Sequence, residues 1–344
     1  MTHRKLWIPL LTSLLLVFGT AVAQSQDMPG EGTTVQPGVA TWQSALPIEA
    51  IFAELLGELG YDVAPAQSVS NPIFYQSVTQ GDVDYWANGW FPLHNAQLPA
   101  TFEDTAAVVG TIVENGAIQG YLVDAASAQE YDITSLEDFK RPEVKEAFDA
   151  NGDGKADMVA CPPGWGCEQV ISHHMDVYDL DDHVNLITAS YAASFADALA
   201  RYRNGEPVLY YTWTPNFTVV ELEPGEDVVW INVPEIIASE AQTGLEDAMV
   251  ASGVTGAVTD PLMFGFVAND IRPVANQEFL NANPAAGALF EAVQIPLADI
   301  SEMTRRISEG ESSDDAIVEM AAEWIENNRE TVDGWLEQAR AAAM

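Results

Sequence analysis

The heptapeptide CPPGWGC at residues 161–167 holds both cysteines of the chain, together with a tryptophan, two glycines and two prolines. Neither a core helix nor a core strand suits this mixture, because proline fixes φ and lacks an N–H, whereas glycine adopts backbone conformations that other residues avoid. The sequence therefore predicts a rigid loop at this point. The loop presents one large aromatic ring, Trp165, and several free backbone N–H groups.

Two further tryptophans stand in similar segments that contain proline. Trp90 lies in NGWFPLH at residues 88–94, and Trp213 lies in YTWTP at residues 211–215. Each follows an expected strand, and ligands of α/β sheets bind beyond the carboxyl ends of the strands. We therefore predict that the three segments meet around one small ligand.

Helix and strand patterns alternate along the chain, which is typical of an α/β protein with parallel sheets. With 344 residues, of which 48% are hydrophobic, the chain is long enough for two lobes. Residues 263–268 are expected to return the chain to the first lobe, and a helix is expected over 273–281. The predicted organisation is lobe I from residues 28–118 and 259–344, lobe II from residues 119–258, and a ligand cleft between the lobes.

The N-terminal 23 residues have the pattern of a secretory signal peptide. Arg4 and Lys5 precede an apolar run at residues 6–18, and small residues at 21–23 predict cleavage after about Ala23. An uncleaved anchor is the alternative, but the run is shorter than the ~20 residues that span a bilayer. The mature protein is expected to be exported to the periplasm.

The expected export affects whether the two cysteines form a disulfide. An even number of cysteines in an oxidising compartment favours a disulfide between Cys161 and Cys167, and the alternative is two unpaired thiols without a role. A disulfide removes the thiolate that a catalytic Cys167, paired with His173 or His174, would need. We therefore expect a binding protein and not an enzyme.

The chain is strongly acidic, with 52 Asp and Glu residues against 13 Lys and Arg residues and a net charge of −39. Such a surface repels a phosphate backbone, which excludes nucleic acid as a partner. The charge could attract a cationic ligand. Its even spread along the chain instead favours a solvated surface suited to high external salt, where the Debye length falls to ~3 Å.

Three tryptophans are candidates for an aromatic cage: Trp90, Trp165 and Trp213. Trp42 and Tyr211 are candidate additions to it. Ring faces attract a cation, and each desolvated contact contributes ~1–2 kcal/mol. A cage without hydrogen-bond acceptors suits a cation that has no N–H to donate, which describes a quaternary ammonium. The alternative for each ring is core packing.

An anion site is expected beside this cage. The N–H groups of Gly166 and Cys167 precede a helix expected from about residue 168, and backbone donors at a helix N-terminus favour an anion. His94 is a candidate further donor, with an ordinary surface or core histidine as the alternative. A cation cage beside a carboxylate site describes a betaine.

Three motifs carry a family resemblance: WFPLH at residues 90–94, CPPGWGCE at 161–168 and YYTWTP at 210–215. The chain resembles the periplasmic glycine betaine/proline betaine-binding proteins of osmoregulatory ABC importers over nearly all of its mature length. The resemblance implies a two-lobed periplasmic-binding-protein fold of type II that closes on a betaine. It also implies a monomer that delivers its ligand to an inner-membrane ABC permease with a cytoplasmic ATPase.

The same resemblance implies a role for each site residue. The box around the ammonium would be Trp90, Trp165 and Trp213, and the carboxylate would meet His94 and the amides of Gly166 and Cys167. Gly89 and the segment around Trp42 depart from the family pattern, and we expect both to reshape the pocket. Choline or carnitine is the alternative ligand, and a ligand-sensing domain that signals to a membrane receptor is the alternative role.

A segment rich in aspartate, DANGDGKAD, precedes the loop at residues 149–157. Four of its residues match positions 1, 3, 5 and 9 of an EF-hand loop: Asp149, Asn151, Asp153 and Asp157. The twelfth position is Ala160 in place of the bidentate glutamate. The prediction is therefore at most a weak structural calcium site, with a plain turn as the alternative, and no other cofactor is expected.

Overall fold

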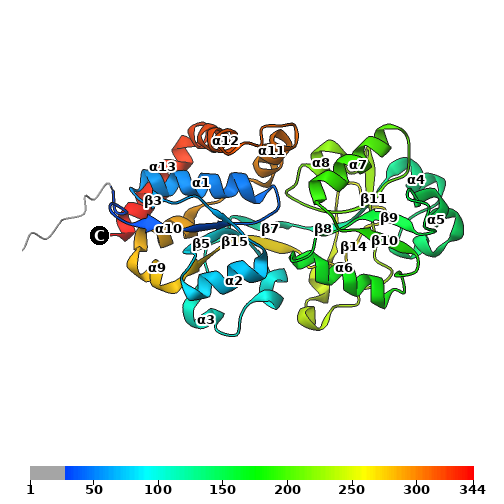
Figure 1. Ribbon diagram of the computed structural model, residues 1–344, viewed down its shortest axis with the longest axis horizontal. Helices are drawn as coiled ribbons and strands as arrows, with labels where there is room; N and C mark the ends of the chain where they lie inside the picture. The colour runs from blue at the N-terminus through cyan, green and yellow to red at the C-terminus, as the bar shows by residue number, and fades with distance from the viewer. Residues whose placement is uncertain (1–27) are drawn as a thin grey trace, which may run out of the picture.

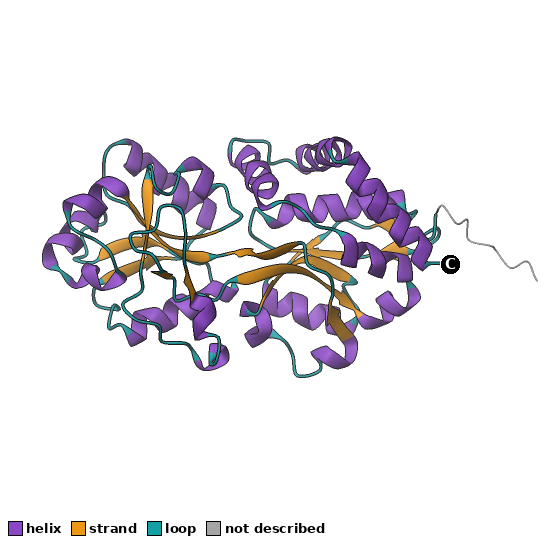
Figure 2. Ribbon diagram, turned by 180° about the vertical axis from the view of Figure 1, so that it is seen from behind, coloured by secondary structure: helices purple, strands orange, loops and turns teal. Residues whose placement is uncertain are grey.

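A computed structural model describes residues 28–344, and the predicted signal peptide at residues 1–23 lies outside them. Two α/β lobes lie side by side along the long axis of the molecule (Figure 1). In each lobe, helices cover both faces of a central sheet (Figure 2). Along residues 28–344, no helix is long and apolar enough to cross a membrane.

Lobe I contains a six-stranded sheet in which β4, β2, β5, β15 and β6 are neighbours in that order and β7 pairs with β15. The strands of the lobe are β1 (Thr34–Val35), β2 (Pro37–Val39), β3 (Asp62–Val63), β4 (Gln67–Ser68), β5 (Tyr85–Phe91), β6 (Ala106–Val108), β7 (Val113–Ala117) and β15 (Asn269–Asn276). Its helices are α1 (Ala45–Glu58), α2 (Asn71–Gln80), the 3-10 helix η1 (Leu93–Gln97), α3 (Phe102–Thr105), α9 (Gln277–Ala282), α10 (Pro284–Ala292), α11 (Leu297–Ser308), α12 (Asp314–Asn327) and α13 (Arg329–Ala342).

Lobe II contains a five-stranded sheet in the order β10, β9, β11, β8, β12. Its strands are β8 (Gln119–Asp124), β9 (Ala156–Val159), β10 (Val184–Ile187), β11 (Leu209–Trp213), β12 (Val228–Ile231), β13 (Val250–Ala251) and β14 (Leu262–Met263). Its helices are α4 (Ala125–Glu130), α5 (Pro142–Phe148), α6 (Gly166–Val177), α7 (Tyr191–Arg203) and α8 (Thr218–Glu221), with 3-10 helices η2 (Leu136–Lys140), η3 (Glu240–Gln242) and η4 (Glu246–Met249).

Helix α1 forms because its apolar residues recur at helical spacing. Ile48, Ile51, Phe52 and Leu55 are all fully buried. The helix ends before Gly60, whose φ of 92° lies in a region that favours glycine. The segment that leads into α1, residues 41–44, lies at the boundary with lobe II, where it accepts hydrogen bonds from that lobe.

The chain crosses between the lobes twice. The first crossing, between β7 and β8, is a single residue, Ile118, and the second is residues 264–268 between β14 and β15. The second crossing falls within residues 263–268, the segment expected to return the chain to lobe I: β14 ends at Met263 and pairs with β13 in lobe II. The first strand of lobe I after the inserted lobe is β15. The domain boundaries drawn at residues 118/119 and 258/259 stay a prediction.

The helix expected over residues 273–281 begins four residues too early. Pro273 resembles the first residue of a helix, but it lies inside β15, where the pairing with β5 shifts register between Arg272 and Val274. A register shift is one of the few places where a sheet tolerates proline. The sequence predicts parallel sheets, but the main sheet of each lobe is mixed. In lobe I, β15 runs antiparallel to β5, and in lobe II, β8 runs antiparallel to β11 and β12.

Candidate ligand-binding site

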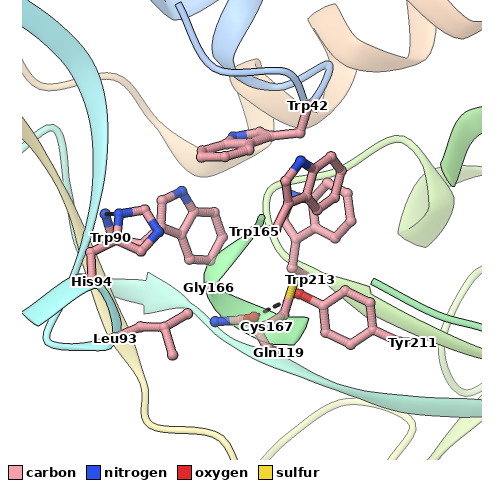
Figure 3. A pocket seen from close by; sticks show the side chains of 10 residues that line it. All are labelled: Trp42, Trp90, Leu93, His94, Gln119, Trp165, Gly166, Cys167, Tyr211 and Trp213. Atoms are coloured by element: carbon pink, nitrogen blue, oxygen red, sulfur yellow. Dashed lines mark hydrogen bonds between the residues drawn. The ribbon is translucent and has the colours of Figure 1, made fainter. Parts of the chain in front are cut away.

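A small cavity lies between the two lobes. Its lining is Trp42, Trp90, Leu93, His94, Gln119, Trp165, Gly166, Cys167, Tyr211 and Trp213 (Figure 3). The structure thus brings together every residue that the sequence proposed for ligand binding.

Lobe I supplies two indole rings to the cavity, Trp42 and Trp90. Trp90 lies within β5, not in a loop beyond it as expected, and alternation along the strand puts Asn88 on the same face. The Oδ1 atom of Asn88 accepts a hydrogen bond from the Nε1 of each indole, both at 2.9 Å. One buried carboxamide oxygen therefore fixes both rings.

Lobe II supplies the other two rings, Trp165 and Trp213, which meet edge to face with centroids 5.4 Å apart. Both rings also reach lobe I. Trp165 Nε1 donates to Thr41 Oγ1 at 2.7 Å, and Trp213 Nε1 donates to Ser44 Oγ at 3.4 Å. The lobes are thus closed on one another through the same side chains that line the cavity.

The electrostatics of the cavity follow from these bonds. All four indole N–H groups have acceptors within the protein, so the rings offer π faces and C–H edges to a ligand. The lining has no Asp, Glu, Lys or Arg side chain. Such a surface attracts a cation through ring quadrupoles and offers no carboxylate to an N–H donor.

The loop at residues 161–167 has the predicted disulfide between Cys161 and Cys167, with Cα atoms 5.9 Å apart. Trp165 is the N-cap of α6, so Gly166 and Cys167 are the first helical residues. N–H groups at these positions have no carbonyl partner within a helix. A Cβ on Gly166 would lie 3.0 Å from both His94 Cδ2 and Leu93 Cδ2, so glycine lets the helix end approach lobe I closely.

His94 is buried and neutral. Burial lowers its pKa to about 3. Its Nδ1 accepts a hydrogen bond from the Trp90 N–H at 3.1 Å and lies 2.7 Å from the Tyr75 hydroxyl, while its Nε2 lies 3.0 Å from Asn71 Nδ2. Both ring nitrogens therefore face partners of lobe I, and a bond from His94 to a ligand would require one of these partners to be exchanged.

Sequence reasoning missed Asn88 and Gln119. Gln119 opens β8 and is buried; its Oε1 accepts a hydrogen bond from the Tyr211 hydroxyl at 2.6 Å. The available signal was a polar residue within an apolar strand, since a buried polar group is costly without a partner. That signal does not identify the hydrogen-bond partner, because the partner depends on the register between paired strands and not on the spacing of residues along the sequence.

Gly89 does not line the cavity. It lies on the opposite face of β5 from Trp90, and a Cβ there would lie 2.6 Å from Phe91 Cε2 and 3.0 Å from the Arg272 carbonyl oxygen. Close packing behind the strand therefore accounts for the glycine. Trp42, the other departure, does line the cavity.

In the aspartate-rich loop, the carboxylates accept hydrogen bonds from N–H groups of the loop itself. Asp149 accepts hydrogen bonds from the backbone N–H groups of residues 152, 153 and 154, and Asp157 accepts from those of residues 150 and 151. Asn151 and Asp153 each accept a further backbone bond. In residues 28–344, no group of three or more His, Cys, Asp and Glu side chains is placed to hold a metal ion, and the calcium site stays a prediction.

Comparison with known proteins places this geometry in a family. Residues 33–327 match OpuAC, the substrate binding domain of ABC-type glycine betaine transport system. The chain is 38% identical over 331 residues to the glycine betaine-binding periplasmic protein OusX of Dickeya dadantii (strain 3937), which covers 96% of this chain and 97% of that protein. It is 37% identical over 323 residues to the glycine betaine/proline betaine-binding periplasmic protein of Salmonella typhimurium (strain LT2), covering 94% and 95% of the two chains.

A solved structure supports the fold. The glycine betaine, L-proline-binding protein ProX of Borrelia burgdorferi aligns with a TM-score of 0.67 at 18% identity, over 91% of this chain and 100% of that one. This likeness confirms the two-lobed α/β fold that the sequence predicts. With the family match over residues 33–327, it follows that the chain belongs to the family of substrate-binding domains of ABC-type glycine betaine transport systems.

Proposed function

We propose that this protein captures glycine betaine or proline betaine in the periplasm and delivers it to an inner-membrane ABC permease with its cytoplasmic ATPase. The observation that carries the proposal is the cavity between the lobes. It combines four indole rings, no charged side chain and the N-terminus of α6. A betaine has a permanent cation at one end and a carboxylate at the other, and the two ends of the cavity suit these groups.

The ring end favours a quaternary ammonium over a primary amine. A primary ammonium brings N–H donors that need acceptors, and the four indoles provide none. Methyl groups on nitrogen spread the positive charge over an apolar surface that packs against the rings of Trp42, Trp90, Trp165 and Trp213. Each desolvated ring contact contributes ~1–2 kcal/mol.

The other end favours a carboxylate. The N–H groups of Gly166 and Cys167 stand at the N-terminus of α6, a helix of 12 residues, where the helix dipole also favours an anion. The disulfide holds these amides at a fixed distance from the Trp165 ring in the same loop. No cofactor or metal is needed for this recognition.

Binding is proposed to act through lobe closure. Open and closed states interconvert, and a ligand that touches both lobes stabilises the closed state. The structure places cross-lobe bonds at Thr41 and Ser44, beside the rings that would contact the ligand. No chemistry on the ligand is proposed, since the only two cysteines of the chain are joined in a disulfide and do not act as nucleophiles.

Isothermal titration calorimetry with glycine betaine, proline betaine and choline tests the proposal. The expected result is that at least one betaine binds more tightly than choline, because choline lacks a carboxylate. Tighter binding of choline than of either betaine would contradict the carboxylate end. Absence of heat with all three ligands would contradict the proposed function as a whole.

A further inference from the structure

Gln119 carries a hydrogen-bond donor that the protein leaves unused inside the cavity. The residue is only 2% exposed, and its Nε2 is buried without a hydrogen-bond partner. In Figure 3 this nitrogen points away from Tyr211, toward Leu93 and the interior of the ring of lining residues. A buried donor without a partner destabilises a protein, so the cavity contains a donor that a ligand can satisfy.

Tyr211 determines which way the carboxamide faces. Its hydroxyl donates to Gln119 Oε1 at 2.6 Å. Burial raises the pKa of Tyr211 well above its usual value, so the phenol keeps its proton. With the carboxamide reversed, an N–H group would face the hydroxyl and the phenol proton would lose this acceptor. The bond to Tyr211 therefore directs Nε2, and not Oε1, into the cavity.

The sheet fixes the position of this donor relative to the rings. Gln119 is directly opposite Trp213 in the antiparallel pairing of β8 with β11. Residues directly opposite one another in such a pair have their side chains on the same face. Gln119 and the Trp213 ring are thus cross-strand neighbours, and the hydrogen bonds between β8 and β11 keep their separation constant.

We propose that Gln119 Nε2 donates a hydrogen bond to the carboxylate of the bound ligand and makes the site selective for carboxylate-bearing betaines over choline. This inference rests on the proposed function and names the residue that sets its ligand class. Gln119 acts together with the amides of Gly166 and Cys167, which also belong to lobe II. Choline, which has a hydroxyl in place of the carboxylate, gains less from this donor.

The test measures the affinities of glycine betaine and choline by calorimetry for the full mature chain and its Gln119→Leu variant. Glycine betaine is expected to bind roughly tenfold more weakly to the variant, since bonds to charged groups are among the stronger hydrogen bonds. Choline is expected to change less than twofold. Gln119→Glu should bind glycine betaine more weakly still, because it opposes one carboxylate with another, and should retain choline.

Gln242→Leu is the matched control. Gln242 is also buried with an unpartnered Nε2, and η3, where it lies, contacts η1 at the lobe boundary, but it does not line the cavity. Both affinities should be unchanged in this variant. If Gln119→Leu does not fold, Tyr211→Phe serves instead, because it removes the bond that orients the carboxamide and should weaken glycine betaine more than choline.

The outcomes separate this inference from the proposed function. An unmodified chain that binds no betaine contradicts the proposed function and, with it, the role of Gln119. An unmodified chain that binds glycine betaine, with a Gln119→Leu variant that is equally tight or loses both ligands to the same degree, overturns the role of Gln119 and leaves the function intact.

Discussion

Lobe I and lobe II face the same cavity with different chemistry. Each supplies two indole rings, but the backbone amides at the start of α6 and the free donor of Gln119 all belong to lobe II. In lobe I, the ring nitrogens of His94 already face Tyr75, Trp90 and Asn71. Lobe II therefore offers partners for both ends of a betaine, whereas lobe I offers two rings to the cation and His94, which would have to exchange a present partner to meet the carboxylate.

This difference suggests an order of events. We expect a ligand to dock first on lobe II, where both of its charges find partners. Closure then adds the rings of Trp42 and Trp90 and the bonds across the lobe boundary to Thr41 and Ser44. Substitutions in lobe II should weaken the initial docking, and substitutions in lobe I should mainly shorten the time that the ligand stays bound.

The largest expected effect concerns stability in acid, to which each lobe contributes one buried histidine. His94 in lobe I and His174 in lobe II both have pKa values lowered to about 3, mainly by burial. Because the folded pKa lies below the unfolded one, the stabilisation is present above about pH 6.5 and is lost as the pH falls toward 3. Each histidine should lower the free energy of unfolding by about 1.4 kcal/mol per pH unit across this range.

Denaturant unfolding at several pH values checks this prediction. His94→Gln and His174→Gln should each remove about half of the decrease in the free energy of unfolding that the two histidines cause in acid. Only His94→Gln should also alter betaine affinity, because His174 bonds to Tyr121 and the Gly265 carbonyl away from the cavity. A decrease in the free energy of unfolding as large in either variant as in the unmodified protein would contradict the assignment.

The next largest effect is expected for Trp165→Ala in lobe II. The ring contacts Trp42 and Trp213 and bonds across the lobe boundary to Thr41. Its loss should cost at least tenfold in affinity for glycine betaine, which is about 1.4 kcal/mol and within the range of one desolvated ring contact. Circular dichroism should show an intact fold. Trp335→Ala, a half-buried tryptophan on α13 outside the cavity, should leave affinity unchanged, and an equal loss in both variants would indicate a general effect on stability.

A smaller effect is expected for Trp42→Ala in lobe I. Because this ring covers the cation only after closure, its loss should weaken binding about fivefold, which is about 1 kcal/mol and at the low end for a desolvated ring contact. Stopped-flow measurements should locate the change in the dissociation rate, with association unaltered. A loss as large as that of Trp165→Ala, or a slower association, would remove the distinction between the lobes.

The smallest change in affinity is expected from the disulfide of lobe II. Replacing Cys161 and Cys167 with serine should lower the free energy of unfolding by about 2 kcal/mol, as loop-length scaling gives for so short a loop. Affinity should fall only about twofold, because α6 still begins at Gly166 and the Trp165 ring keeps its neighbours. Calorimetry on the oxidised protein and the double variant makes the comparison, and complete loss of binding would show that the loop depends on the disulfide for its conformation.

Much of the site could be predicted from the sequence because the types of residue in it are themselves typical of a binding site. Cysteines beside glycine and proline indicate a fixed loop, and tryptophans in such loops indicate a surface built for a ligand. The disulfide is confirmed, and the structure gathers Trp42, Trp90, Trp165 and Trp213 around one cavity. The binding roles of these residues stay predictions until a ligand is measured.

What the sequence could not supply depends on contacts between distant segments. Asn88 matters because it lies between two indoles from separate segments, and Gln119 matters because β8 pairs with β11 in one particular register. Pro273 was misread because a register shift in β15 accommodates it. In each case the local pattern is ordinary, and the tertiary partner decides the role.

The most direct test of the account is a crystal structure of the protein with glycine betaine. The account predicts the trimethylammonium group among the rings of Trp42, Trp90, Trp165 and Trp213. The carboxylate should lie within about 3.2 Å of the Gly166 and Cys167 nitrogens and of Gln119 Nε2. A ligand in the reverse orientation, or one whose carboxylate is held only by lobe I, would contradict it.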